Sequence, residues 1–216
     1  RRYTPTALLQ FKAPMSTTPI TERPVQLQGS ALALWTLRRL GWTLDFSGLP
    51  GPQGVMVVYP HTSNFDFPIG LLAKWAMGLQ VNFWGKDSLF RVPLFGAWMK
   101  WLGGVPVNRS APGGLVAQAA DHLRRCRDEN TFAWLVVAPE GTRKLTDGWR
   151  SGFYRVAHQA DVPLGLATID FGRRHIAVSQ FVRLSGQQAS DMAHIAHRLG
   201  DPKGYHPANA SPVRIT

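Results

Sequence analysis

Cysteine is nearly absent from this 216-residue sequence, which contains only Cys126. A single thiol excludes an intramolecular disulfide, and with it the class of small secreted domains that disulfides hold together. It fits a protein that works in a reducing compartment. Because Cys126 falls on an expected helix, we predict a structural role for it.

Long apolar runs are also missing. No stretch approaches the ~20 apolar residues that a transmembrane helix requires. The first residues lack the apolar core of a signal peptide. We therefore expect the protein to lie on a membrane at most, and not to cross one.

Charged residues make up only 17% of the sequence, and acidic residues are the scarcer kind. The 24 Lys and Arg residues outnumber 13 Asp and Glu, which gives a net charge of +11. Such an excess favours polyanionic partners, which are nucleic acid, anionic lipid headgroups or phosphorylated small molecules. Hydrophobic residues at 44% exclude global disorder, and the length suits one domain with a substantial core.

The polar ends of the sequence bracket this expected domain. Residues 1–29, rich in Pro, Thr and Gln, are expected to form a disordered lead-in, and residues 205–216 a loose tail. The domain between them, residues 30–204, begins with a short amphipathic helix over 30–42. Two interpretations of this helix stay open: it lies on a membrane surface, or it packs on the domain.

Strand-like and helix-like segments alternate through the domain. We expect strands at 55–59, 80–84, 105–108, 132–138, 163–169 and 176–184, and helices at 67–77, 93–102, 114–127, 150–159 and 189–199. Such alternation is typical of α/β proteins. The prediction is an α/β fold with a mostly parallel mixed sheet covered by helices, preceded by the N-terminal amphipathic helix.

His61 and Asp66 follow the apolar run that ends at Tyr59. Because a helix turns about 100° per residue, residues five apart do not share one helical face. His61 is therefore expected in the loop after the strand, and Asp66 in the first turn of the next helix. There the carboxylate can accept a hydrogen bond from one imidazole nitrogen and leave the other as a base for a substrate hydroxyl. A polar loop without catalysis is the alternative.

A second loop follows the apolar run 132–138 and consists of Glu140, Gly141, Thr142 and Arg143. Gly141 lets the backbone turn closely, and the backbone N–H groups of Gly141 and Thr142 can face an anion. Arg143 offers a bidentate fork for phosphate, and Glu140 is a candidate to orient that arginine. Together the two loops predict an enzyme that acts on a phosphorylated substrate.

Lys86 and Arg109 are two further cations, and each stands near an expected strand end between these loops. They either face the same cleft or belong to the solvated surface.

With these motifs in this order, the sequence resembles the 1-acylglycerol-3-phosphate acyltransferases, a glycerolipid acyltransferase family recognised by four ordered blocks. His61 to Asp66 is similar to the family's His-x4-Asp block, and Glu140 to Arg143 to its Glu-Gly-Thr-Arg block. The segment 86–109, with Lys86 and Arg109 at its ends, resembles the second block, and residues 162–164 the fourth, apolar block. The resemblance covers residues 42–185.

The resemblance implies an O-acyltransferase that moves a fatty acyl group from acyl-CoA or acyl carrier protein to a lysophospholipid. The first candidate acceptor is 1-acylglycerol-3-phosphate, which gives phosphatidic acid. It further implies that His61 takes the acceptor's hydroxyl proton while Asp66 holds the imidazole ring. Arg143, with Arg109 and Lys86, then binds the acceptor's phosphate.

The same resemblance implies a location as well. The expected place is the cytoplasmic face of a bacterial inner membrane, where the protein is peripheral or monotopic on an anionic surface. The scheme requires no metal or other cofactor.

The sequence leaves other functions open. Pro60 stands where the family commonly has Asn, so another lysolipid is also a candidate acceptor. The basic charge alone allows a non-enzymatic module that binds an anionic membrane or nucleic acid, although no nucleic-acid motif occurs. Serine-hydrolase and phosphate-loop motifs are missing, and His194 with His197 lacks further metal ligands nearby in the sequence.

Overall fold

A computed structural model describes residues 17–86, 90–101, 103–107 and 114–216. These residues form one eight-stranded sheet with the order β1-β8-β7-β3-β6-β4-β5, and β2 pairs with β8. The pairs from β7 through β5 are parallel, whereas β8 runs antiparallel to β7 and β1. The predicted mostly parallel mixed sheet is confirmed. Its strands are β1 (Thr18–Pro19), β2 (Thr43–Phe46), β3 (Gln53–Tyr59), β4 (Val81–Lys86), β5 (Gly104–Val107), β6 (Ala133–Val137), β7 (Leu164–Asp170) and β8 (His175–Arg183).

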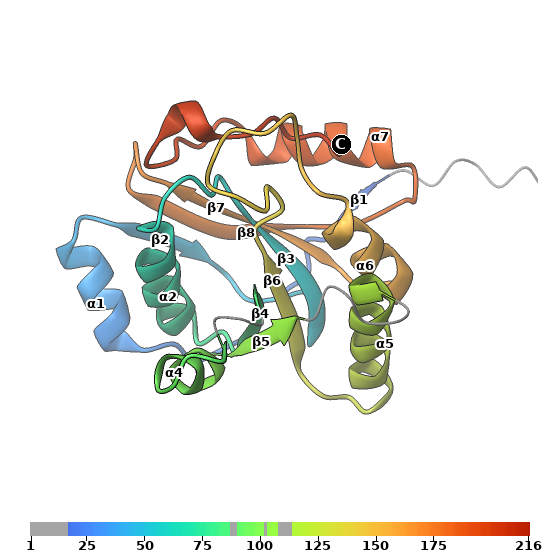
Figure 1. Cartoon of the computed structure of the whole chain (residues 1–216), viewed down its shortest axis with the longest axis horizontal. Helices are drawn as coiled ribbons and strands as arrows, with labels where there is room; N and C mark the ends of the chain where they lie inside the picture. Colours follow the sequence, from blue (N-terminus) through green and yellow to red (C-terminus); the bar gives the residue numbers. More distant parts are fainter. Residues whose placement is uncertain (1–16, 87–89, 102, 108–113) are drawn as a thin grey trace, which may run out of the picture.

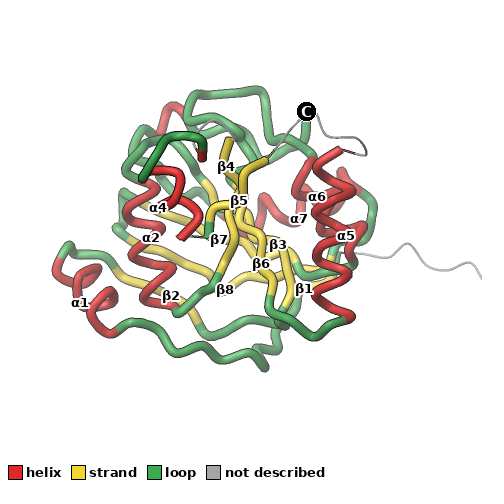
Figure 2. Tube along the Cα trace, turned by 60° about the horizontal axis from the view of Figure 1, so that its bottom comes forward, coloured by secondary structure: helices red, strands yellow, loops and turns green. Residues whose placement is uncertain are grey.

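Helices cover the sheet on both sides, as Figures 1 and 2 show. The helices are α1 (Ala31–Arg39), α2 (Asp66–Met77), α4 (Phe95–Trp101), α5 (Gly114–Asp128), α6 (Gly152–Ala160) and α7 (Gln188–Leu199). Buried residues of α5, α6 and α7 share one hydrophobic cluster, and those of α1 and α2 share another. Among the residues that the structure describes, no helix has the length and apolarity to cross a membrane.

The central strand β3 explains why two cores form. Its side chains alternate, so that Val55 and Val57 enter the α5–α6–α7 cluster while Met56 enters the α1–α2 cluster. A strand buried on both faces reads as a continuous apolar run, as β3 does. Because β3, β6 and β7 are parallel, their carboxyl ends open at the same edge of the sheet. Ligands bind at this edge in open α/β sheets.

The two ends of the chain differ from the sequence prediction. Residues 17–29 of the expected lead-in pack on the domain: Thr17 donates a hydrogen bond to Asp191 of α7, and Arg23 stacks over the ring of Phe181 in β8. Residues 1–16 lie outside the described residues. The segment 205–216, expected to be loose, contains Ser211 with a fully buried side chain. Its backbone bonds to the loops near the carboxyl ends of β3 and β6, and such pairing has no hydrophobic pattern from which to predict it.

Candidate active site

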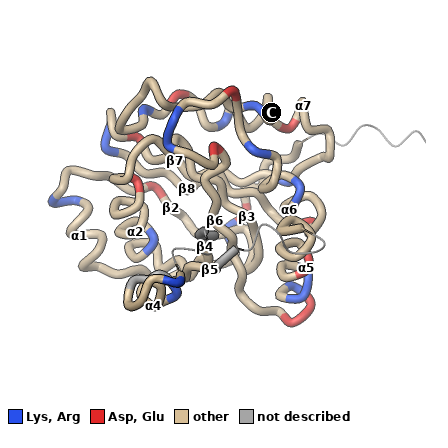
Figure 3. The backbone as a smooth tube through the Cα atoms, in the orientation of Figure 1, with Lys and Arg blue, Asp and Glu red and all other residues tan. Residues whose placement is uncertain are grey.

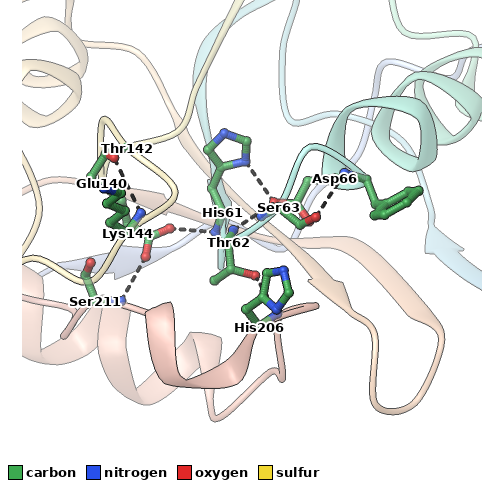
Figure 4. Close-up of polar contacts among 10 residues, drawn as sticks. His61, Thr62, Ser63, Asp66, Glu140, Thr142, Lys144, His206 and Ser211 are labelled. Atoms are coloured by element: carbon green, nitrogen blue, oxygen red, sulfur yellow. Dashed lines mark hydrogen bonds and ion pairs between the residues drawn. The ribbon is translucent and has the colours of Figure 1, made fainter.

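Two loops meet beyond the carboxyl edge of the central strands (Figure 4). The first runs from the end of β3 to the start of α2 and carries His61. The second follows β6 and carries Glu140. Neighbouring parallel strands bring these loops together although 79 positions separate the two residues, and the backbone N–H of His61 donates a hydrogen bond to Glu140 Oε2 at 2.6 Å.

His61 and Asp66 form the pair that their spacing predicts. The imidazole Nδ1 of His61 lies 3.0 Å from Asp66 Oδ2. Asp66 is the first residue of α2 and its side chain is 2% exposed, whereas the His61 side chain is 24% exposed. Since Nδ1 is committed to the carboxylate, Nε2 is the ring nitrogen left to exchange a proton with a substrate.

The loop around this pair is ordered by further hydrogen bonds. The backbone N–H groups of Thr62 and Ser63 donate to Asp66 Oδ2 at 2.8 and 2.9 Å. Ser63 Oγ accepts the backbone N–H of Phe65 at 3.2 Å, which closes a local turn just before α2, whose N-cap residue is Phe65. The carboxylate thus fixes the loop backbone and the imidazole together, which holds the base in one orientation.

The side chain of Glu140 has different partners from those predicted. Its carboxylate was expected to orient Arg143 or to bind substrate, but it is 1% exposed and bridges two backbone N–H groups, those of His61 at Oε2 and Ser211 at Oε1. Burial raises the pKa of Glu140 above its ordinary value, and these two hydrogen bonds oppose the rise. Glu140 therefore holds the loops together and does not face solvent.

The structure also corrects the prediction that the backbone N–H of Gly141 faces an anion. The backbone N–H of Gly141 donates to the carbonyl of Ala138 at 3.1 Å, so it is already used within the turn and cannot face an anion. Gly141 has φ +69°, and a Cβ there would lie 2.6 Å from Nε of Arg150. Glycine is needed at this position because the backbone is left-handed and the Arg150 side chain folds across it.

The structure describes two of the three predicted cationic residues, Arg143 and Lys86. Arg143 is exposed on the second loop, and the half-buried Thr142 beside it accepts the backbone N–H of Lys144 at 3.4 Å. Lys86 is the last residue of β4 and pairs in register with Val107 of β5. Arg109 lies outside the described residues, so its predicted part in the site stays a prediction.

Three residues near the site were missed by sequence reasoning. Arg150 crosses Gly141, Thr62 Oγ1 accepts the backbone N–H of His206, and Ser211 donates to Glu140. Arg150 follows the Glu-Gly-Thr-Arg block closely enough that its charge was a usable signal. Thr62 and Ser211 act through contacts with distant parts of the chain, for which the sequence offers no periodic signal.

No metal site is found in the part of the chain that the structure describes, since no group of three or more His, Cys, Asp or Glu side chains gathers there. His194 Nε2 accepts a hydrogen bond from Arg198 Nε at 2.7 Å, which engages one nitrogen of the histidine pair on α7.

Comparisons with known proteins agree with this geometry. A family model described as Acyltransferase matches residues 46–166, more than half of the chain. A search of curated proteins finds no match. The crystal structure of the 1-acyl-sn-glycerophosphate (LPA) acyltransferase PlsC from Thermotoga maritima is similar in fold, with a TM-score of 0.51 and 19% sequence identity. The similarity covers 77% of this chain and 73% of that chain.

Proposed function

Because the chain belongs to the acyltransferase family, we propose that it moves a fatty acyl group from a thioester donor to the free hydroxyl of a lysophospholipid. The donor is acyl-CoA or acyl carrier protein. The observation that carries the proposal is the His61–Asp66 pair, 3.0 Å apart, with the imidazole partly exposed at the strand ends. A protein that only binds a polyanion needs no oriented base.

The chemistry follows from this pair. Nε2 of His61 takes the proton of the acceptor hydroxyl as its oxygen attacks the thioester carbonyl. The new C–O bond forms, the C–S bond breaks through a tetrahedral intermediate, and His61 returns the proton to the leaving thiolate. Asp66 stabilises the imidazolium between these two steps and keeps the ring in place. Lys86 or backbone N–H groups are the candidates to stabilise the oxyanion.

The acceptor is proposed to carry a phosphate. Arg143 is exposed on the loop next to Glu140, and Arg150 lies across Gly141 of the same loop. A guanidinium offers paired N–H donors that match phosphate oxygens, so two of them close to the turn that carries Glu140 favour a phosphorylated acceptor. We propose 1-acylglycerol-3-phosphate first, with phosphatidic acid as product, and another anionic lysolipid as the alternative.

The protein is proposed to meet its lipid at a membrane surface. Large apolar side chains are exposed on α1, α2 and α4, which lie on the same side of the sheet in Figures 1 and 2: Leu32, Trp35, Phe67, Trp75, Trp98 and Trp101. Arg38 and Arg39 end α1 beside them. Figure 3 shows that Lys and Arg are otherwise spread along the chain. An apolar face with basic residues suits peripheral attachment to an anionic bilayer, proposed as the cytoplasmic face of the inner membrane.

An acceptor panel tests the proposal. The purified protein is incubated with labelled acyl-CoA, or separately with labelled acyl-acyl carrier protein, and with lysophosphatidic acid, lysophosphatidylglycerol and a neutral monoacylglycerol. Product masses identify the acceptor. Turnover that prefers lysophosphatidic acid supports the first choice, preference for lysophosphatidylglycerol supports the alternative, and preference for the neutral lipid removes the phosphate from the account.

A further inference from the structure

The C-terminal segment 204–216 contacts both loops of the candidate site. We call this segment the C-terminal strap; it lies beyond the residues that the family model matches. The backbone N–H of His206 donates to Thr62 Oγ1 at 3.2 Å, next to the base. The backbone N–H of Ser211 donates to Glu140 Oε1 at 2.8 Å. The strap therefore contacts each loop through a separate hydrogen bond.

The Ser211 contact continues to the base itself. Glu140 accepts Ser211 at Oε1 and the backbone N–H of His61 at Oε2, 2.6 Å away. The acceptor Glu140 is 1% exposed and the donor residue Ser211 is 0% exposed, so water does not replace the Ser211 N–H. A buried carboxylate that loses a donor is strongly destabilised and reorients toward another one or toward solvent. The position of His61 therefore depends on what Ser211 donates to Glu140.

The strap approaches the loops too closely for loose packing. A Cβ at Gly204 would lie 2.5 Å from Thr62 Oγ1 and 2.8 Å from its Cγ2. Further along, the backbone N–H of Trp149 donates to the carbonyl of Arg214 at 2.6 Å, and that of Thr216 donates to the carbonyl of Trp149 at 3.1 Å. The strap is thus anchored on both sides of Ser211.

We propose that Ser211 is a positioning residue for acyl transfer, whose backbone N–H holds the Glu140 carboxylate so that it fixes the backbone of His61. The proposal rests on the proposed function, because it assigns a role in that reaction. The hydroxyl of Ser211 also interacts with the Glu140 carboxylate, and its Oγ accepts the backbone N–H of Thr146 at 3.1 Å. Backbone and side-chain contributions can therefore be separated by substitution.

Two substitutions at one position make the test. Ser211→Pro removes the N–H that Glu140 accepts. The preceding Ala210 has φ −68° and ψ 121°, a conformation that a following proline tolerates. Ser211→Ala keeps the N–H and removes the hydroxyl, which proline also lacks, together with its contacts to Thr146 and Glu140, so the two variants differ in the N–H. For Ser211→Pro we expect kcat to fall by about 10- to 100-fold with the acceptor KM nearly unchanged, because a misplaced base costs rate rather than binding. For Ser211→Ala we expect a loss of no more than about threefold in kcat and a lower Tm.

Hydrogen exchange gives a second readout that does not require turnover. Loss of the Ser211 donor should speed exchange of the His61 amide in Ser211→Pro and not in Ser211→Ala. If Ser211→Pro fails to fold, Glu140→Gln replaces it, because the side-chain amide has one oxygen in place of the two that accept the backbone N–H groups of Ser211 and His61. Equal kcat values and equal exchange in the two Ser211 variants would overturn the proposal. Wild-type kcat and wild-type exchange of the His61 amide in Glu140→Gln would also overturn it. A wild-type protein that acylates no lysolipid refutes the proposed function, and the exchange experiment still decides whether Ser211 holds the His61 loop.

Discussion

Oδ2 of Asp66 lies 3.0 Å from Nδ1 of His61 and also accepts the backbone N–H groups of two loop residues, Thr62 and Ser63. One buried oxygen therefore sets both the path of the loop and the orientation of the imidazole. The base is oriented before substrate arrives, which lowers the reorganisation needed in the transition state.

Replacement of Asp66 by asparagine should separate charge from geometry. In Asp66→Asn the amide oxygen can still accept the backbone N–H groups of Thr62 and Ser63, so the fold should survive. The imidazolium formed during proton transfer loses its anionic partner, and we expect kcat to fall by about 10²- to 10⁴-fold. Steady-state kinetics, with circular dichroism to verify the fold, measures this. A variant with wild-type kcat would show that Asp66 is only a structural residue.

Recognition of phosphate by Arg143 should require its planar fork. Arg143→Lys keeps the charge but loses the bidentate geometry, so the acceptor KM should rise about tenfold for a phosphorylated lysolipid and change little for a neutral monoacylglycerol. Arg155→Lys, at an exposed position on α6, is the matched control. Equal changes in KM for both acceptors would show that Arg143 does not bind the phosphate.

The buried Glu140 carboxyl should make stability depend on pH. Its pKa in the folded protein is raised by burial, so the folded state holds this proton more tightly than the unfolded state does. The stability that protonation of Glu140 contributes is fully present below the unfolded pKa and is lost as pH rises through the folded pKa. Because Glu140→Gln cannot titrate there, the unfolding free energy of the wild type minus that of the variant should increase as pH falls from about 8 to about 4.

Urea unfolding of both proteins across this pH range measures the difference. A constant difference would mean that Glu140 titrates as it does in the unfolded chain. A difference that decreased on acidification would mean that its hydrogen bonds outweigh burial and hold the pKa down.

Membrane attachment should depend on the outer face of α1. Deleting the whole helix is uninformative, because Leu37 is fully buried and the deletion would open the core. Leu32 and Trp35 are exposed. Replacing both with serine should lower the fraction of the protein that sediments with anionic vesicles in high salt. Replacing Arg38 and Arg39 with glutamine should instead remove the part of the binding that salt screens. If the Leu32 and Trp35 substitutions leave vesicle binding unchanged, α1 is ordinary packing and Trp98 and Trp101 become the next candidates.

Sequence reasoning predicted the parts of this protein that local patterns encode. The apolar run of β3 located the strand, and the spacing of His61 and Asp66 placed one in the loop and the other at the start of α2. It failed where distant segments decide the outcome. Glu140 was assigned to Arg143, its neighbour in sequence, whereas the fold gives it backbone donors 79 and 71 positions away. The β2 strand was missed because it is short and pairs only with β8.

The most direct test of the account is thioester turnover by the wild type and by His61→Ala. Acyl-CoA and lysophosphatidic acid are supplied at saturating concentrations, released thiol is followed with time, and the lipid product is identified by its mass. The account predicts equal amounts of thiol and phosphatidic acid from the wild type, and a decrease in kcat of about 10²-fold or more in the folded variant. Near wild-type turnover by His61→Ala would contradict the account. So would vesicle binding by the wild type without thiol release from either acyl-CoA or acylated acyl carrier protein.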